Sequence, residues 1–164
     1  MYQIQLDFPN QSVVVPISTI AALGFPKKIH FLYHREDGMI GIKESTGPIM
    51  VPSSDGKSRP YDPAISLLDK WDEDKKCFVV PCIVRTLALF AEHIPNFNPR
   101  DPYLLTGDYH LEDMISFLTA EAIPGAEFTP VELAPEDQDR FLRFKETFTQ
   151  LLSRKRGRKK HEIL

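Results

Sequence analysis

The stretch that decides the fold is Val13-Val14-Val15-Pro16-Ile17-Ser18-Thr19-Ile20-Ala21-Ala22-Leu23-Gly24. Three consecutive β-branched residues favour a strand, and the proline that follows them ends it. The next residues are too few for a long helix, but they suit one or two helical turns that begin at a Ser18 cap and end at Gly24. We therefore predict a strand that leads directly into a short helix.

Strand patterns lie on both sides of this stretch. At 4–8, apolar residues alternate with polar ones, which is the period-two signature of a half-buried strand. Downstream, apolar runs at 29–34 and 39–42 flank Glu36-Asp37-Gly38, whose turn residues are typical of a β-hairpin. Residues 1–45 are therefore predicted to form a small β unit in the order β, β, short α, β, β.

This order and its residues resemble the AbrB/SpoVT-type swapped-hairpin domain. In that family a valine-rich strand ends in proline, a short helix ends in Leu-Gly and a hairpin closes the unit, as Val13-Val14-Val15-Pro16, Leu23-Gly24 and 29–42 do here. The resemblance implies a DNA-binding homodimer with basic groups in the loop after the helix, a region that Lys27 and Lys28 match. The arginine that the family often carries four positions after the proline is replaced by isoleucine.

A similar motif occurs in the middle of the chain. Phe78-Val79-Val80-Pro81 is followed by Val84 and Arg85, an apolar residue and an arginine at the family's spacing, which adds Arg85 to the candidate DNA contacts. Two such units in one chain would pair with each other and build the domain internally. A single unit would need a second copy of the chain.

The competing interpretation of the middle region is helical, and we favour it. It places one helix at 82–93, before Pro95, and another at 109–122, capped by Asp108. The second helix rests on apolar residues at helical spacing: Leu111, Met114, Ile115 and Leu118.

Residues 135–153 have the pattern of an amphipathic helix. Pro135 suits the first turn, and the acidic residues after it complement the positive end of the helix dipole. Apolar residues recur on one face: Phe141, Phe144, Phe148 and Leu151. This face either packs within its own domain or forms the interface with a protein partner.

A basic tail at 154–164 follows this helix. Its cations are Arg154, Lys155, Arg156, Arg158, Lys159 and Lys160. Residues 1–153 hold 14 Lys/Arg and 22 Asp/Glu, a net charge of −8, whereas the tail holds six and one, a net charge of +5. Any contact with nucleic acid must therefore be local. We expect the tail to be disordered on its own, and Arg156-Gly157-Arg158 resembles an AT-hook, which implies A·T-rich DNA.

Composition argues against several other classes of protein. Hydrophobic residues make up 42% and charged residues 26%, as in globular proteins, and no apolar run is long enough to cross a membrane. Without a recognisable leader we expect a cytoplasmic protein with no membrane contact. The chain lacks glycine-rich phosphate loops and nucleophile elbows, so we expect no enzyme activity and no cofactor.

A metal site is also not expected. Cys77 and Cys82 lie five residues apart, which is too wide for a structural zinc pair, and we expect both thiols to be buried. His30 and His34 lie four apart on a predicted strand, where we expect exposed hairpin residues.

Together these patterns predict an α+β protein. The expected parts are a β unit at 1–45, a linker or exposed loop at 46–63, a mainly helical region at 64–153 that ends in the helix at 135–153, and the tail at 154–164. The resemblance and the tail both suggest a DNA-binding transcription regulator or antitoxin-like protein. The alternative is a non-enzymatic interaction or scaffold protein that uses the C-terminal helix.

Overall fold

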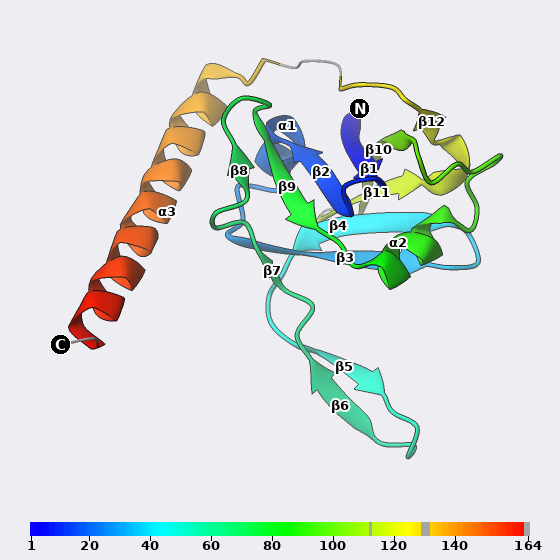
Figure 1. Ribbon diagram of the computed structural model, residues 1–164, viewed down its shortest axis with the longest axis horizontal. Helices are drawn as coiled ribbons and strands as arrows, with labels where there is room; N and C mark the ends of the chain where they lie inside the picture. Colours follow the sequence, from blue (N-terminus) through cyan, green and yellow to red (C-terminus); the bar gives the residue numbers. More distant parts are fainter. Residues whose placement is uncertain (112, 129–131, 163–164) are drawn as a thin grey trace. The chain divides into compact units, whose positions relative to one another are not determined.

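A computed structural model describes residues 1–111, 113–128 and 132–162; of Leu111 and of 151–162 it describes the backbone only. The chain divides into two compact units, Met1–Pro130 and Val131–Leu164. The first is α+β and consists mainly of one curled antiparallel sheet, while the second contains a single long helix (Figure 1). The α+β class is therefore confirmed, whereas a mainly helical region at 64–153 is not what the structure shows.

The first part of the chain forms the elements that its sequence predicts. They are β1 (Tyr2–Asp7), β2 (Ser12–Pro16), α1 (Ile17–Ala22), β3 (Lys28–His34) and β4 (Met39–Glu44). The predicted Ser18 cap is wrong, because α1 begins directly after Pro16 and has no side-chain cap. Gly24 ends the helix with a positive φ of 85°, and Gly38 supplies the positive φ of the β3–β4 turn.

The middle of the chain adds mostly strands. These are β7 (Ile65–Ser66), β8 (Trp71–Asp72), β9 (Cys77–Pro81), β10 (Pro102–Leu111), β11 (Met114–Leu118) and β12 (Ile123–Pro124), together with α2 (Val84–Ala91) and the 3-10 turn η1 (Thr119–Glu121). The helix predicted at 82–93 is confirmed as α2, but the helix predicted at 109–122 is wrong. Within that range β10 extends to Leu111, β11 covers Met114–Leu118 and η1 covers Thr119–Glu121. Asp108 lies within β10 rather than at a helix cap.

Residues 114–118 form a strand because side chains on both faces of the sheet are buried there. Met114, Ile115 and Phe117 are all buried, so β11 lacks the apolar–polar alternation of a half-exposed strand. A short apolar run of this kind is equally compatible with helical spacing. Pairing with β4 on one side and β10 on the other decides in favour of a strand.

The sheet follows the order β7-β3-β4-β11-β10-β1-β2-β9-β8, with β12 added on β10, and every pairing is antiparallel. Its two outermost strands, β7 and β8, are neighbours in the chain, joined by residues 67–70. The chain itself therefore brings the two edges of the curled sheet together (Figure 1). Curling encloses a core of fully buried side chains: Ile4, Leu6, Val13, Val15, Ile40, Ile42, Phe78, Val80, Leu105 and Ile115.

Two halves of the sheet match each other in order and in sequence. The series β2-α1-β3-β4 is followed by β9-α2-β10-β11, and β2 pairs with β9 while β4 pairs with β11. When the Val-Val-Pro motifs of the halves are aligned, Val14 corresponds to Val79, and these residues lie opposite each other in the sheet. An approximate two-fold axis thus passes between β2 and β9, at Val14 and Val79.

A second sequence match supports the same relation. Tyr33-His34-Arg35-Glu36-Asp37-Gly38-Met39-Ile40 corresponds to Tyr109-His110-Leu111-Glu112-Asp113-Met114-Ile115, with the turn glycine missing from the second copy. Continuing this alignment matches Gly41 with Ser116, which also lie opposite each other. Gln11 and Lys76, which correspond to each other and precede β2 and β9, both have a positive φ, 50° and 52°. The middle region therefore repeats the element order of the first half. Of the two helices that the sequence favours there, only the one at 82–93 is present.

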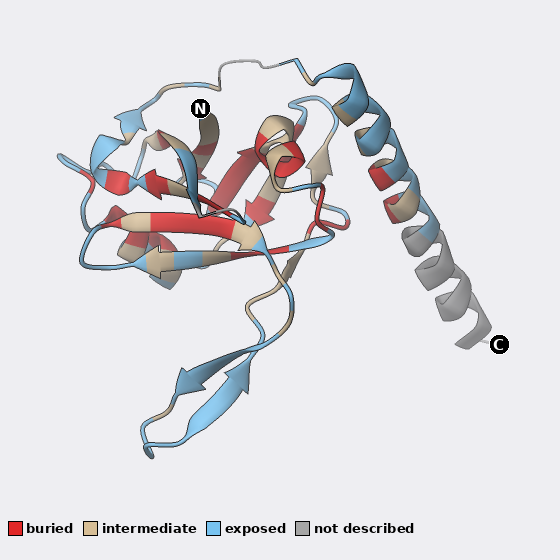
Figure 2. Cartoon of the chain, turned by 180° about the vertical axis from the view of Figure 1, so that it is seen from behind, coloured by how far each residue is buried: buried red, intermediate tan, exposed pale blue. Residues whose placement is uncertain are grey.

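Between the halves, β5 (Ile49–Pro52) and β6 (Ser58–Tyr61) form a separate two-stranded ribbon, here called the arm. All eight strand residues of the arm are exposed (Figure 2). The arm lies within the segment predicted as a linker or exposed loop, and it pairs with no strand of the curled sheet.

The second unit contains α3 (Pro135–Glu162), with Glu136 and Asp137 in its first turn. The helix begins where the sequence predicts it. Its backbone continues beyond residue 153 into the tail that we expected to be disordered.

Candidate nucleic-acid interface

Lys27 and Lys28 lie on an open concavity where α1 passes into β3. Gly24 and Phe25 adopt positive φ values of 85° and 54°, and the Phe25 N–H donates to the Ile20 carbonyl, which turns the chain out of the helix. The concavity has a volume of about 420 Å³, and its lining consists of Gly24, Phe25, Pro26, Lys27, Lys28, Glu44 and Ser45.

The backbone of both lysines is held on two sides. The Lys27 carbonyl accepts a hydrogen bond from the Leu67 N–H at 2.9 Å, and the Lys28 carbonyl accepts one from the Ser45 N–H at 3.0 Å. Phe25, which precedes them, is 9% exposed and anchors the turn in the core. The two ammonium groups therefore extend from a fixed backbone.

The charges of these lysines are available to a ligand. Both side chains are exposed, and neither forms an ion pair with any residue that the structure describes. Glu44 contributes one carboxylate to the same concavity. Two cations on a rigid turn can bind phosphate oxygens, because the lysine ammonium acts as a compact point charge with three donors.

Arg85 does not join this concavity. It is exposed in the first turn of α2, the counterpart of α1 in the second half, while the lysines follow α1 in the first half. Each of these two helices follows a Val-Val-Pro strand end, α1 directly and α2 after Cys82 and Ile83, so the candidate basic residues lie at related but separate places on the sheet.

The cations of the tail have side chains outside the described residues. Arg154, Lys155, Arg156, Arg158, Lys159 and Lys160 are carried on the helical backbone of α3, and the structure places none of their charged groups. The same holds for the side chain of Leu151.

The phenylalanines of α3 form a cluster within the helix. The rings of Phe144 and Phe148 meet edge to face at 4.3 Å, and the two residues are only 7% and 8% exposed. Phe141 is half-buried, and the Lys145 ammonium lies 5.3 Å from its ring centroid. Because Phe144 and Phe148 are buried, this face of the helix exposes less apolar surface to a partner than the sequence pattern suggests.

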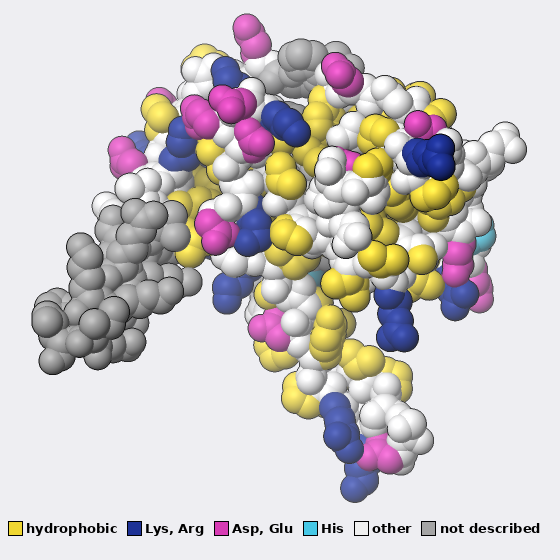
Figure 3. All heavy atoms as spheres, viewed as in Figure 1, with side chains coloured by type: hydrophobic (Ala, Val, Ile, Leu, Met, Phe, Trp, Pro, Cys, Tyr) yellow, Lys and Arg dark blue, Asp and Glu magenta, His cyan; other side chains and the backbone are white. Residues whose placement is uncertain are grey.

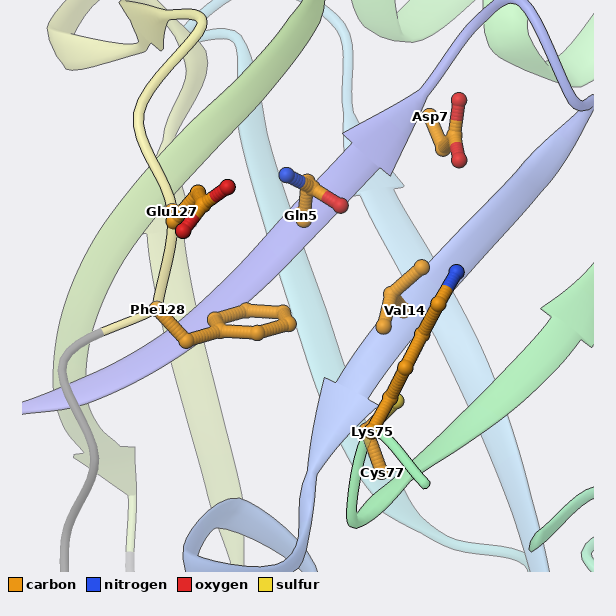
Figure 4. A pocket seen from close by; sticks show the side chains of 7 residues that line it. All are labelled: Gln5, Asp7, Val14, Lys75, Cys77, Glu127 and Phe128. Atoms are coloured by element: carbon orange, nitrogen blue, oxygen red, sulfur yellow. The ribbon is translucent and has the colours of Figure 1, made fainter. Parts of the chain in front are cut away.

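A second concavity, of about 360 Å³, opens beside β1 and β2 (Figure 4). Polar side chains of Gln5, Asp7, Lys75 and Glu127 surround an apolar floor that includes Val14 and Phe128. Cys77 also lines it, but the thiol is 1% exposed, and burial raises its pKa. A thiol held in its protonated form is a poor nucleophile.

The cysteines and histidines whose side chains the structure describes lie apart from one another in the fold. Among the described residues, no group of three or more His, Cys, Asp or Glu side chains is placed to hold an ion. Burial raises the pKa of the Cys82 thiol to about 11. The expectation that His30 is exposed is wrong: it is 3% exposed and burial lowers its pKa, whereas His34 is exposed and lies 2.8 Å from Asp37.

His30 was misjudged because the hairpin is covered on one face. It pairs with Lys43 across β3 and β4 and points into the molecule, as its 3% exposure shows. The Tyr-His-x-Glu-Asp repeat was the sequence signal that could have revealed the second hairpin, and it was missed because the turn of the second copy is one residue shorter.

None of the described helices is both long and apolar enough to cross a membrane. Comparison with protein-family models, with curated proteins and with solved structures found no match for this chain.

Proposed function

We propose that this protein is a non-enzymatic, cytoplasmic DNA-binding regulator, either a transcription regulator or an antitoxin-like protein. The observation that carries the proposal is the concavity at Lys27 and Lys28, where two exposed ammonium groups, neither in an ion pair with a described residue, extend from a fixed turn. This is the region where the AbrB/SpoVT-type resemblance implies basic groups.

The matching halves of the sheet support the proposal. Residues 1–45 carry the resemblance, and the β9-α2-β10-β11 series repeats their element order with Arg85 in its helix. Pairing of β2 with β9 and of β4 with β11 joins the halves inside one chain. A swapped-hairpin arrangement would then be built internally, without the second copy that a single unit needs.

The acidic body restricts the mode of binding. A net charge of −8 over residues 1–153 repels a duplex from most of the surface, so affinity must come from the lysine turn, Arg85 and the six cations of the tail. An AT-hook-like Arg-Gly-Arg would favour the narrow minor groove of A·T-rich DNA.

The test is binding to a random and an A·T-rich duplex over a salt series. The double variant Lys27→Glu/Lys28→Glu should bind at least about tenfold more weakly and should lower the slope of log affinity against log salt by about 2, because each lost phosphate contact releases about one counterion fewer. Truncation after Ser153 should lower both affinity and slope further.

The matched control is Lys75→Glu/Lys76→Glu, which changes the same charge at another exposed pair. It should weaken binding less and lower the salt slope less than the Lys27→Glu/Lys28→Glu change. Equal losses in the two double variants would show that only net charge matters. Absence of binding by the full chain at low salt would overturn the proposal.

The scaffold alternative depends on the face formed by Phe141, Phe144, Phe148 and Leu151. The burial of Phe144 and Phe148 does not favour it. A partner held by that face would show little salt dependence, in contrast to a phosphate contact.

A further inference from the structure

The arm has apolar side chains that nothing in the described structure covers. Met50 is 63% exposed and Tyr61 is 59% exposed, and Ile49 and Val51 are both more than a third exposed. Figure 3 shows hydrophobic side chains on the surface of the arm, on the part nearer the curled sheet. By the strand register, Ile49, Val51 and Tyr61 lie on one face of the ribbon and Met50 on the other, so both faces expose apolar side chains. A lone two-stranded ribbon is only marginally stable in water, and exposed apolar surface of this kind marks an interaction site.

An apolar groove lies at the root of the arm. It has a volume of about 410 Å³ and lies between the arm, β3 and the start of α2. Its lining includes Phe31, Tyr61, Ile65, Pro81 and Ile83, together with the carboxylate of Asp62. Ile83, which lines it, and Val84, which follows in the chain, are 67% and 61% exposed. The groove thus continues the apolar surface of the arm.

Opposite charges lie at the two ends of the arm. Lys57 lies in the turn at the tip, while Asp62, the only charged residue lining the groove, lies at the root. Neither forms an ion pair with a described residue, whereas Arg59 is already paired with Asp55 at 3.0 Å. If two arms lie antiparallel about a two-fold axis, each basic tip meets the acidic root of the other.

We propose that the groove of one copy receives the arm of a second copy of this chain. The surface is self-complementary, as a two-fold interface requires. Each copy supplies the exposed apolar arm with its cationic tip, and each copy also supplies the apolar groove with the carboxylate of Asp62 in its wall. The dimer forms through the arm rather than through the curled sheet, because β2, β4, β9 and β11 already pair within the chain. This inference is independent of the proposed DNA binding.

The first test measures the mass of the full chain in solution as a function of concentration, by sedimentation or light scattering. The wild type should be a dimer, and Met50→Asp should weaken association at least about tenfold, because it places a charge in the apolar contact. Ile123→Asp is the matched control, since Ile123 is 52% exposed on β12, outside the arm and groove. It should remain a dimer.

The second test exchanges the charges. Lys57→Glu and Asp62→Lys should each weaken the dimer, and the double variant should recover the association that each single variant loses. A simple folding defect would not produce this recovery. Circular dichroism checks that each variant keeps its secondary structure.

A wild-type chain that stays monomeric over the whole concentration range would overturn the proposal. So would a double variant no better than the single ones, or an equal loss in Ile123→Asp. If the arm variants lose duplex binding while the mass is unchanged, the arm contacts nucleic acid instead, and the dimer proposal is wrong.

Discussion

At the scale of single residues, the tightest constraints lie where neighbouring strands approach most closely. Gly107 in β10 faces Phe117 in β11, and a β-carbon at this position would overlap the Ser116 carbonyl. Gly41 in β4 faces Ser116 from the other side, but there the nearest obstacle is the flexible side chain of Met114. Backbone atoms cannot move aside as a methionine can.

Gly107→Ala should therefore destabilise the protein by about 3 kcal/mol, near the upper end for overpacking in a sheet. Gly41→Ala should cost about 1 kcal/mol, because Met114 can adopt another rotamer. Denaturant unfolding monitored by circular dichroism measures both. Equal losses in the two variants would mean that the close approach of β10 and β11 is not what excludes a side chain.

Buried His30 links stability to pH. Burial lowers its pKa below the usual 6.5, the charge of Lys43 lowers it further, and Asp62 partly opposes them. Because the unfolded state then binds the proton more readily, stability is fully present above about pH 6.5 and falls as the pH drops toward the lowered value.

His30→Gln should remove this acid-dependent loss, so its unfolding midpoint should change less than that of the wild type between about pH 8 and pH 5. His34→Gln, at an exposed histidine, is the control and should keep the wild-type loss. A wild-type loss that persists in His30→Gln would assign the effect to other groups.

At the scale of elements, the arm differs from all other strands of the first unit. Its two strands pair only with each other, through the register Ile49↔Tyr61 to Pro52↔Ser58. The arm leaves the first half after β4 and returns to the second half before β7. It therefore contributes little to the core of the curled sheet.

At a protein concentration low enough for the wild type to be monomeric, replacing residues 49–61 by a short Gly-Ser linker should change the free energy of unfolding by less than about 1 kcal/mol, since loop length affects stability weakly. Chemical denaturation tests this. Loss of cooperative unfolding in this variant would show that the arm supports the sheet after all.

Among the helices, α2 packs by its apolar face on β3. Phe90 lies 5.2 Å from the Tyr33 ring and 6.5 Å from the Phe31 ring. The helix expected at 82–93, before Pro95, is confirmed, and its buried residues are Leu87, Phe90 and Ala91. Helical spacing gave the wrong result for 109–122, where two neighbouring strands, and not the spacing of Leu111, Met114, Ile115 and Leu118, determine the structure.

At the scale of the whole molecule, the two halves are interdependent. The pairings of β1 with β10, β2 with β9, β3 with β7 and β4 with β11 all join residues before the arm to residues after it. Such long-range contacts must form together, since no half buries its apolar strands alone.

Cutting the chain at Gly56, in the exposed turn of the arm, should give two fragments, 1–56 and 57–164, that do not fold as monomers. Mixed together, they should recover the circular dichroism and the cooperative unfolding of the intact chain. A fragment that is a folded monomer by itself would contradict the dependence of each half on the other.

By itself, the sequence determined the elements whose signals are local: the alternation of β1, the Val-Val-Val-Pro strand end, the short α1 with its glycine, the β3–β4 turn and the start of α3. These patterns extend over a few residues, and backbone propensity is enough to set them. Lys27 and Lys28 were indicated only by the resemblance to the swapped-hairpin family, and the structure places both side chains in an exposed turn after α1.

Only the tertiary structure decided which strands pair, that 109–111 and 114–118 belong to strands, that His30 is buried and that 49–61 form an arm with an apolar groove at its root. Each of these depends on contacts between residues far apart in the chain, such as Val14 with Val79 and Gly41 with Ser116. Their free energy comes from burial shared by both partners, so neither segment carries the signal alone.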